Sequence, residues 1–130
     1  MNTQQKIEEF LKAPAFAVVG ASDNPEKFGH KVYKLYLRHN MKAFPVNNRL
    51  KEIDGAQVYP SLSQLPEKVS SVSVITPPAV TEQVVDDAIA AGIKNIWMQP
   101  GAESQVAVEK AEKAGLNVIH GGPCILVQLG

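Results

Sequence analysis

Short apolar runs alternate with helical patterns along this 130-residue chain, and that alternation restricts the fold most. The apolar runs are residues 15–19, 43–46, 72–75, 94–98 and 116–119. Apolar residues recur at helical spacing in one segment before the first run, residues 2–11, and in three segments after later positions, residues 28–40, 80–92 and 106–115. Alternating strands and helices build a parallel sheet with helices on both faces. We therefore predict a three-layer, Rossmann-like α/β fold with about five parallel strands, forming one domain over residues 1–130.

The segment between residues 50 and 70 carries a weaker pattern, in which Gly55 and Pro60 interrupt the chain. Residues 57–59 are expected to form a short edge strand, and residues 61–66 one helical turn that ends at a proline. At the N-terminus, Asn2 and Gln5 have the spacing of a capping box, which predicts a short helix.

Composition excludes several classes of function. Lys plus Arg and Asp plus Glu both number 13, so no basic field favours nucleic acid. No apolar run approaches the roughly 18 residues that span a bilayer, and the polar N-terminus does not resemble a signal peptide. The single cysteine fits a reducing compartment. We expect a cytoplasmic protein without nucleic-acid or membrane partners, and the sequence does not identify a protein partner.

The first apolar run ends at Gly20, Ala21 and Ser22, and a polar loop then leads to a helical pattern from Phe28. A strand that passes through a glycine turn into a helix N-terminus offers free backbone N–H groups to an anion, commonly phosphate. The Ser22 hydroxyl and the Lys27 ammonium are placed to assist. This turn predicts a phosphate-bearing nucleotide cofactor.

Two departures from the dinucleotide fingerprint narrow the choice of cofactor. The G-x-G-x-x-G pattern needs a glycine at position 22, where Ser22 stands. NAD enzymes carry Asp or Glu after the second strand, whereas here Asn47, Asn48 and Arg49 follow it. A carboxylate would repel a ribose phosphate and an arginine would bind it, so NADP or coenzyme A is favoured over NAD.

In an open α/β sheet the ligand binds beyond the carboxyl ends of the strands. The loops expected there are residues 20–30, 47–51, 76–80, 99–104 and 120–124. Glycine and proline are common in such loops whatever their function. Several of them converging on one edge nevertheless favour a cofactor site.

Other reactive side chains give little support for catalysis. Cys124 either starts a short helix that would favour its thiolate, able to form a mixed disulfide with a coenzyme thiol, or is a buried apolar residue. The histidines are scattered and form no metal cluster, while His30 either assists phosphate binding or lies on the surface. Asp86 and Asp87 are expected on a solvated helix face. No catalytic residue and no metal site is predicted.

An ordered set of motifs resembles the small stand-alone coenzyme A-binding proteins. The segments that carry the resemblance are residues 18–22, 45–47, 55–62, 76–78 and the region of Cys124, and together they cover nearly the whole chain. This family is similar to the N-terminal Rossmann-like domain of the succinyl-CoA synthetase α-subunit. The cofactor implied by the resemblance is therefore coenzyme A or an acyl-CoA.

The resemblance also implies positions for the parts of the coenzyme. Gly20, Ala21, Ser22 and Lys27 would contact the pyrophosphate, while Asn47, Asn48 and Arg49 would lie near the adenosine and its ribose phosphate. Thr76, Pro77 and Pro78 would line the nucleotide crevice, and Gln99, Pro100 and Gly101 would lie toward the pantetheine arm. Asn48 departs from the family, which often has proline there.

The function expected is binding of coenzyme A or an acyl-CoA without catalytic groups of its own. The synthetase's phosphohistidine belongs to a further domain and its nucleotide-grasping subunit to another chain, so we expect no ligase activity from these 130 residues. Two alternatives remain open at this point: an NADP-binding oxidoreductase or sensor, and a regulatory protein with a vestigial nucleotide site.

Overall fold

The computed structural model describes all 130 residues and contains a sheet of five parallel strands in the order β2-β1-β5-β6-β7. The strands of this sheet are β1 (Phe16–Val19), β2 (Ala43–Val46), β5 (Ser71–Val74), β6 (Asn95–Met98) and β7 (Asn117–Ile119). The helices are α1 (Thr3–Leu11), α2 (Phe28–Arg38), α3 (Pro78–Ala90), α4 (Gln105–Lys113) and α5 (Ile125–Leu129). The predicted Rossmann-like α/β fold with five parallel strands is confirmed.

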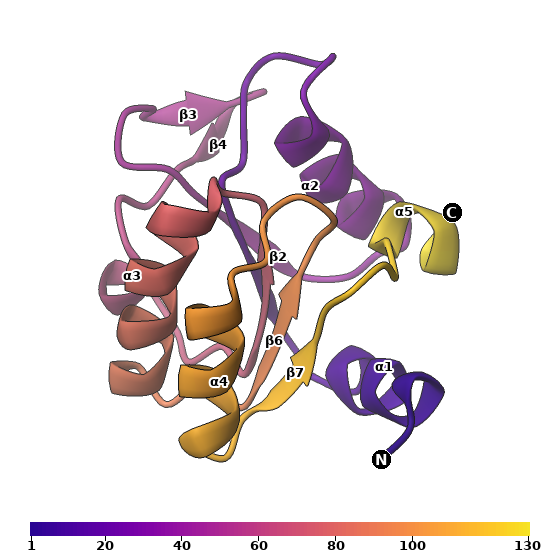
Figure 1. Ribbon diagram of the computed structural model, residues 1–130. Helices are drawn as coiled ribbons and strands as arrows, with labels where there is room; N and C mark the ends of the chain where they lie inside the picture. Colours follow the sequence, from indigo (N-terminus) through magenta and orange to yellow (C-terminus); the bar gives the residue numbers. More distant parts are fainter.

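Helices cover both faces of the sheet and make three layers (Figure 1). α3 and α4 pack on one face, and α1, α2 and α5 pack on the other. The period-two alternation of each strand supplies both cores: Ala17 and Val19 face α3 and α4, while Phe16 and Val18 face the other helices. Because both faces are covered, each of the five strands is buried at every residue or at all but one.

Local signals account for the helix boundaries. The Asn2 side chain accepts from the N–H of Gln5 at 2.8 Å, and the Gln5 side chain accepts from the N–H of Asn2 at 2.9 Å, which is the predicted capping box. Pro78 is the first residue of α3, where its missing N–H costs nothing. Ser104 caps α4 by accepting from the N–H of Ala107.

The region between β2 and β5 differs from the prediction of an edge strand at residues 57–59. A two-stranded antiparallel hairpin, β3 (Glu52–Ile53) and β4 (Ala56–Gln57), lies here instead, turning at Asp54 and Gly55 with φ of 48° and 85°. Tyr59 forms an isolated bridge with Val46 rather than belonging to a strand. Asp-Gly is a strong signal for this type of turn, and the sequence prediction overlooked it. The predicted helical turn is present as η1 (Leu62–Gln64).

A buried hydroxyl pair ties α2 to the middle of the sheet. The Tyr36 hydroxyl lies 2.6 Å from the Ser73 hydroxyl, and Tyr36 is completely buried. Burial raises the pKa of Tyr36 well above its ordinary value of 10.0, and the bond from Ser73 only partly opposes that rise. The neutral phenol is therefore the form that the core accommodates.

The strand order reverses between β1 and β5. From β1 the chain proceeds outward to β2, then crosses back to β5 on the other side of β1. In open α/β sheets a crevice forms at such a switch point, beyond the carboxyl ends of the strands. The fold thus places the candidate site at the ends of β1 and β5.

Candidate functional site

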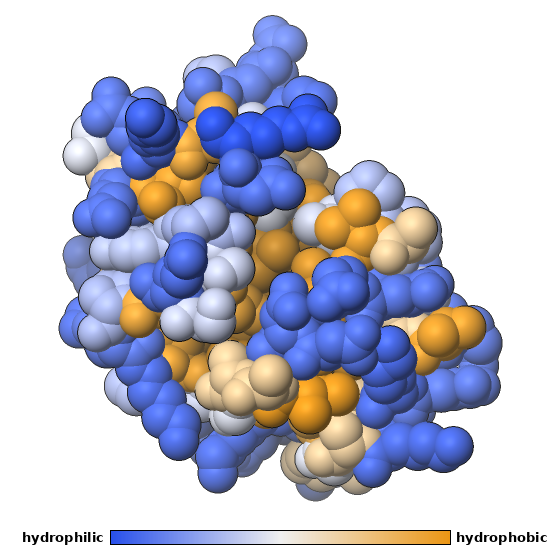
Figure 2. All heavy atoms as spheres, turned by 90° about the vertical axis from the view of Figure 1, so that its left-hand side faces the viewer, coloured by the Kyte–Doolittle hydropathy of each residue, from blue (hydrophilic) through white to orange (hydrophobic).

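A cleft of about 260 Å³ lies at this switch point, between the strand ends and α3, and we call it the α3 cleft. Its lining residues are Val19, Gly20, Val46, Asn47, Asn48, Pro60, Ser61, Leu62, Thr76, Val80, Gln83, Val84 and Asp87. Figure 2 shows the side of the molecule on which α3 lies, where apolar atoms are recessed between hydrophilic side chains. An apolar hollow with a few polar groups at its margin is the usual form of a small-molecule site.

Gly20 closes one end of the α3 cleft, and two backbones approach it closely. Its φ of 97° lies in the left-handed region, and a Cβ there would collide with the carbonyl oxygen of Ile75. A Cβ at Gly29, in the first turn of α2, would collide with the carbonyl oxygen of Gly20. The structure therefore uses Gly29 for the tight helix-to-strand packing that the third glycine provides in the dinucleotide fingerprint. From the sequence, Gly29 was only part of the expected loop at residues 20–30.

The start of α2 retains unpaired donors beside this turn. The N–H groups of Phe28 and Gly29 make no hydrogen bond within the chain, as expected for the first turn of a helix. Lys27 occupies the N-cap position, is exposed and forms no ion pair. The Ser22 hydroxyl accepts from the N–H of Asn24 at 3.1 Å. Ala21, Ser22 and Lys27 thus lie next to the glycine turn but do not line the α3 cleft.

His30, in the first turn of α2, contacts the glycine loop. Its Nδ1 lies 2.9 Å from the Ser22 carbonyl oxygen, and its Nε2 lies 3.7 Å from the Asp54 carboxylate in the β3–β4 turn. The residue is only 8% exposed, so of the two alternatives left open by the sequence, the surface histidine is wrong. Because its ring is hydrogen-bonded to the backbone of the loop, His30 is placed to stabilise the loop.

The three residues after β2 have different environments. Asn47 donates to the Ala21 carbonyl at 2.9 Å and accepts from the N–H groups of Arg49 at 2.8 Å and Leu50 at 3.3 Å. Its side chain therefore joins the loop after β2 to the turn after β1. Asn48 lines the cleft with no hydrogen bond within the chain, and Arg49 is exposed without an ion pair.

The loop after β5 contributes one lining residue. The Thr76 hydroxyl lies 2.8 Å from the Thr81 hydroxyl, so it is already engaged within the chain. Pro77 and Pro78 are exposed and start α3 outside the cleft. Their effect is to set where the helix begins.

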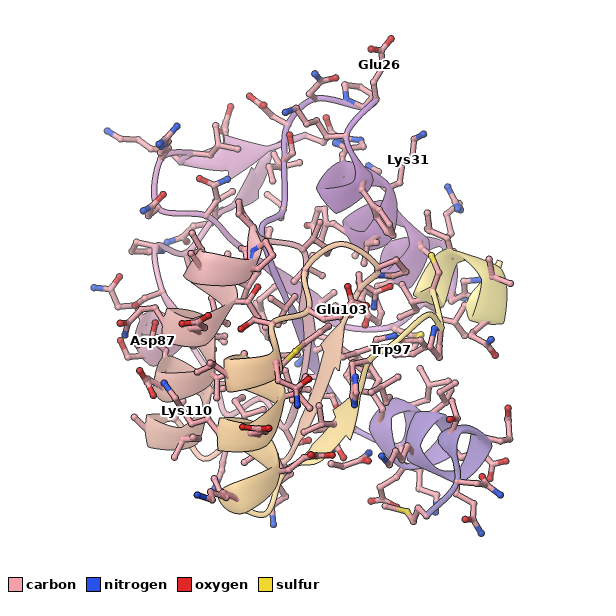
Figure 3. The ribbon with its side chains drawn as sticks, in the orientation of Figure 1. Glu26, Lys31, Asp87, Trp97, Glu103 and Lys110 are labelled. Atoms are coloured by element: carbon pink, nitrogen blue, oxygen red, sulfur yellow. The ribbon has the colours of Figure 1, made fainter.

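The loop after β6 lies away from the α3 cleft. Gln99 is completely buried, and its Oε1 accepts from the N–H of Ile125, the first residue of α5, at 3.0 Å. Glu103 accepts from the N–H of Gly101 at 2.8 Å and of Gly121 at 3.3 Å, joining two loops at this edge of the sheet (Figure 3). Pro100 and Gly101 are exposed. A pantetheine contact at residues 99–101 stays a prediction.

One wall of the α3 cleft is helical and was not predicted from the sequence. Val80, Val84 and Asp87 lie on α3 and line the α3 cleft, together with Gln83. Residues three and four apart share one face of a helix, so the spacing shows that these side chains lie together, but it does not say which face meets the cleft. Asp87 had been assigned to a solvated face, and that assignment is wrong because the residue is half-buried in the wall of the cleft.

Cys124 and Trp97 do not line the α3 cleft. Cys124 is half-buried and immediately precedes the five-residue helix α5. Trp97, completely buried, packs edge-on against Phe10 and donates to the Pro123 carbonyl at 2.9 Å, as a core residue does.

No group of three or more His, Cys, Asp or Glu side chains is arranged to hold a metal ion. None of the helices has both the length and the apolar character that a bilayer crossing requires.

A family model described as "CoA binding domain" matches residues 14–130. The chain belongs to this family. One relative is the α subunit of an ADP-forming acetate–CoA ligase II from Pyrococcus furiosus, to which the chain is 28% identical over 130 residues. That match covers 92% of the chain but only 28% of the ligase subunit.

Solved structures with the same architecture also resemble this CoA-binding domain. A hypothetical protein from Pyrococcus horikoshii OT3 superposes with a TM-score of 0.91 and 30% identity, covering 98% of this chain and 89% of that one. A conserved hypothetical protein from Pyrococcus furiosus gives a TM-score of 0.82 and 40% identity, covering 88% and 97% of the two chains. These alignments cover most of the neighbours' own chains, whereas the alignment with the ligase covers only 28% of the ligase subunit.

Proposed function

We propose that this chain binds coenzyme A or an acyl-CoA at the carboxyl ends of β1, β2 and β5, with the adenosine end in the α3 cleft. The observation that carries the proposal is the position of this cleft, at the strand switch and against Gly20, in a chain of the CoA-binding domain family. In Rossmann-like folds the nucleotide occupies this crevice.

The volume of the α3 cleft supports partial enclosure of the ligand. Pockets that hold a whole drug-sized molecule measure about 300–1,000 Å³. At about 260 Å³ the cleft fits one end of a coenzyme, and the remainder would lie along the sheet edge. The pyrophosphate would lie at Gly20, Ala21 and Ser22, near Lys27 and the unpaired N–H groups of α2.

The ribose phosphate would lie near Arg49. Arg49 is exposed, follows a lining residue of the cleft and has no carboxylate partner, so its guanidinium is free to bind a phosphate in two-point fashion. Lys51 is exposed two residues further on. The pantetheine arm would then pass toward residues 99–101, at the ends of β6 and β7.

The chain is proposed to act as a binding module, and the catalytic roles of larger relatives are not transferred to it. Asp87 is the only ionisable side chain that lines the α3 cleft. No nucleophile with a neighbouring base lines the cleft, whereas acyl transfer through an enzyme-bound intermediate needs both.

Calorimetric titration with coenzyme A, 3′-dephospho-coenzyme A and NADP⁺ tests the proposal. Coenzyme A should bind most tightly, and the loss of the 3′-phosphate should weaken binding. Binding of NADP⁺ alone would refute the assignment in favour of a dinucleotide protein. Absence of binding by all three would indicate a vestigial site.

A further inference from the structure

Two polar side chains on α3, Gln83 and Asp87, face the α3 cleft one helical turn apart. Gln83 Nε2 donates to Asp87 Oδ1 at 3.2 Å, so the two side chains form one hydrogen-bonded pair on the cleft wall. Asp87 forms no ion pair. Its neighbour Asp86 lies 3.0 Å from the ammonium of Lys110 on α4 (Figure 3 labels Asp87 and Lys110). Two adjacent carboxylates therefore have different environments, one engaged with a lysine and one in the cleft.

The remaining polar groups of the cleft are mostly engaged within the chain. The Asn47 side chain makes three hydrogen bonds, and the Thr76 hydroxyl is paired with Thr81. The Ser61 hydroxyl lies 3.0 Å from the Ser63 hydroxyl. Besides Asn48, the side-chain groups of the cleft without a partner in the chain are the second carboxylate oxygen of Asp87 and the outer edge of the Gln83 amide. A carboxylate accepts hydrogen bonds and repels phosphate. The ligand group that approaches Asp87 must therefore carry a hydrogen-bond donor and no negative charge.

Apolar side chains surround this polar pair. Leu62 is 5% exposed and Val84 is 6% exposed, and both line the cleft with Val80, which is 47% exposed at its mouth. Such walls suit a flat group that has apolar faces and a polar edge. Within coenzyme A, the adenine ring has this shape, and its 6-amino group is a donor on that edge.

Building on the proposed function, we propose that Asp87 accepts a hydrogen bond from the adenine 6-amino group while Gln83 bonds the adjacent ring nitrogen. Carboxylates accept from exocyclic amino groups, and glutamine amides pair with the amino and ring-nitrogen edge of adenine. The pair makes the α3 cleft selective for a 6-aminopurine over a 6-oxopurine, whose oxygen would face the carboxylate. The purine specificity of the site thus comes from α3.

The test compares coenzyme A with its hypoxanthine counterpart, in which an oxo group replaces the 6-amino group. The wild-type chain should bind coenzyme A about tenfold or more tightly, as expected for loss of a hydrogen bond to a charged acceptor. In Asp87→Ala this preference should fall to about twofold or less. Gln83→Ala should reduce it by a smaller factor.

Asp86→Ala is the matched control, because it removes the same charge from the neighbouring position outside the cleft. It should retain the wild-type preference. Asp87→Asn serves as a nearly isosteric second variant if Asp87→Ala does not fold, and its preference should also fall.

Each outcome bears on the inference. If the wild-type chain binds both coenzymes equally, or if the Asp87 variants keep the full preference, the base assignment is wrong while coenzyme binding stands. If wild type binds neither coenzyme, the proposed function fails and the base assignment fails with it.

Discussion

The side-chain amide of Asn47 donates to the carbonyl oxygen of Ala21 at 2.9 Å and so joins the loop after β2 to the turn after β1. Its Oδ1 accepts from two N–H groups of its own loop. The two loops that flank one end of the α3 cleft are therefore held together by one side chain. Sequence analysis predicted that Asn47 contacts the coenzyme, and its hydrogen bonds give it in addition a structural role.

Substitution Asn47→Ala should destabilise the chain by about 1–3 kcal/mol, because three hydrogen bonds are lost around a half-buried position. Coenzyme A should also bind more weakly, since the turn at Gly20 loses its support. Urea unfolding and calorimetry measure the two effects. Asn48→Ala is the control for stability and should stay within about 0.5 kcal/mol of wild type. Equal stability of both variants would contradict the role assigned to Asn47.

Substitution Gly29→Ala tests the close packing of α2 on the glycine turn. Alanine in a helix is ordinarily favoured over glycine by about 0.5–1 kcal/mol. Here the new methyl group meets the Gly20 carbonyl oxygen, so we expect a net loss of about 1–3 kcal/mol and weaker coenzyme A binding. Lys31→Ala, at an exposed position in the same helix, should leave both quantities nearly unchanged. A stabilised Gly29→Ala variant would show that the turn is able to relax.

Substitution Arg49→Ala should weaken coenzyme A by about 1–3 kcal/mol, the size of a charge-assisted hydrogen bond, and hardly change 3′-dephospho-coenzyme A. Titration of both ligands measures the difference. Arg38→Ala, which removes an exposed arginine in the last turn of α2, controls for net charge. Equal weakening of both ligands by Arg49→Ala would exclude this residue from the phosphate site, and Lys51 would be examined next.

The buried Tyr36 should make stability fall at alkaline pH. Its pKa is raised by burial in the folded state, so the unfolded chain loses the phenolic proton at lower pH than the folded chain. The contribution of Tyr36 is therefore fully present below about pH 10 and is lost as the pH rises above that value toward the folded-state pKa.

Urea unfolding across the alkaline range measures this dependence. Tyr36→Phe should lose stability less steeply above about pH 10 than wild type. At neutral pH it should be less stable by about 1–3 kcal/mol, because the Ser73 hydroxyl is left without its partner. Burial also raises the pKa of Tyr33, so the double variant Tyr33→Phe/Tyr36→Phe should show the smallest change of stability with alkaline pH. An unchanged alkaline slope in Tyr36→Phe would contradict the assignment.

The sheet and its helices could be predicted from the sequence because local and long-range signals agree there. Each predicted apolar run corresponds to a strand of the sheet, such as β1, which is buried at every residue. Asn2 and Gln5 form the capping box that their spacing predicts. The β3–β4 hairpin was missed because its strands are two residues long and present no periodicity. The Asp54-Gly55 pair was the only local signal, and the prediction from the sequence did not use it.

The site could be predicted only in part. The strand-end rule expected Gly20, Asn47, Asn48 and Thr76 at the same edge of the sheet, and all four line the α3 cleft, since the rule depends on sheet topology alone. The face of α3 that looks into the cleft depends on how the helix packs, and helical spacing does not say which polar residue is shielded from water. Asp86 and Asp87 are adjacent and chemically identical, yet Asp86 forms an ion pair with Lys110 and Asp87 lines the α3 cleft.

The crossover from β2 to β5 has a consequence for folding order. Pro60, Ser61 and Leu62 line the α3 cleft and belong to this crossover, while other lining residues belong to β1, β2 and the helix after β5. The cleft therefore does not exist until segments distant in sequence have met, which is the slow part of building a parallel sheet. A ligand held there would bind only the assembled state and shift the unfolding equilibrium by mass action. Occupancy of the α3 cleft by a ligand would thus report the assembly of β1, β2 and β5.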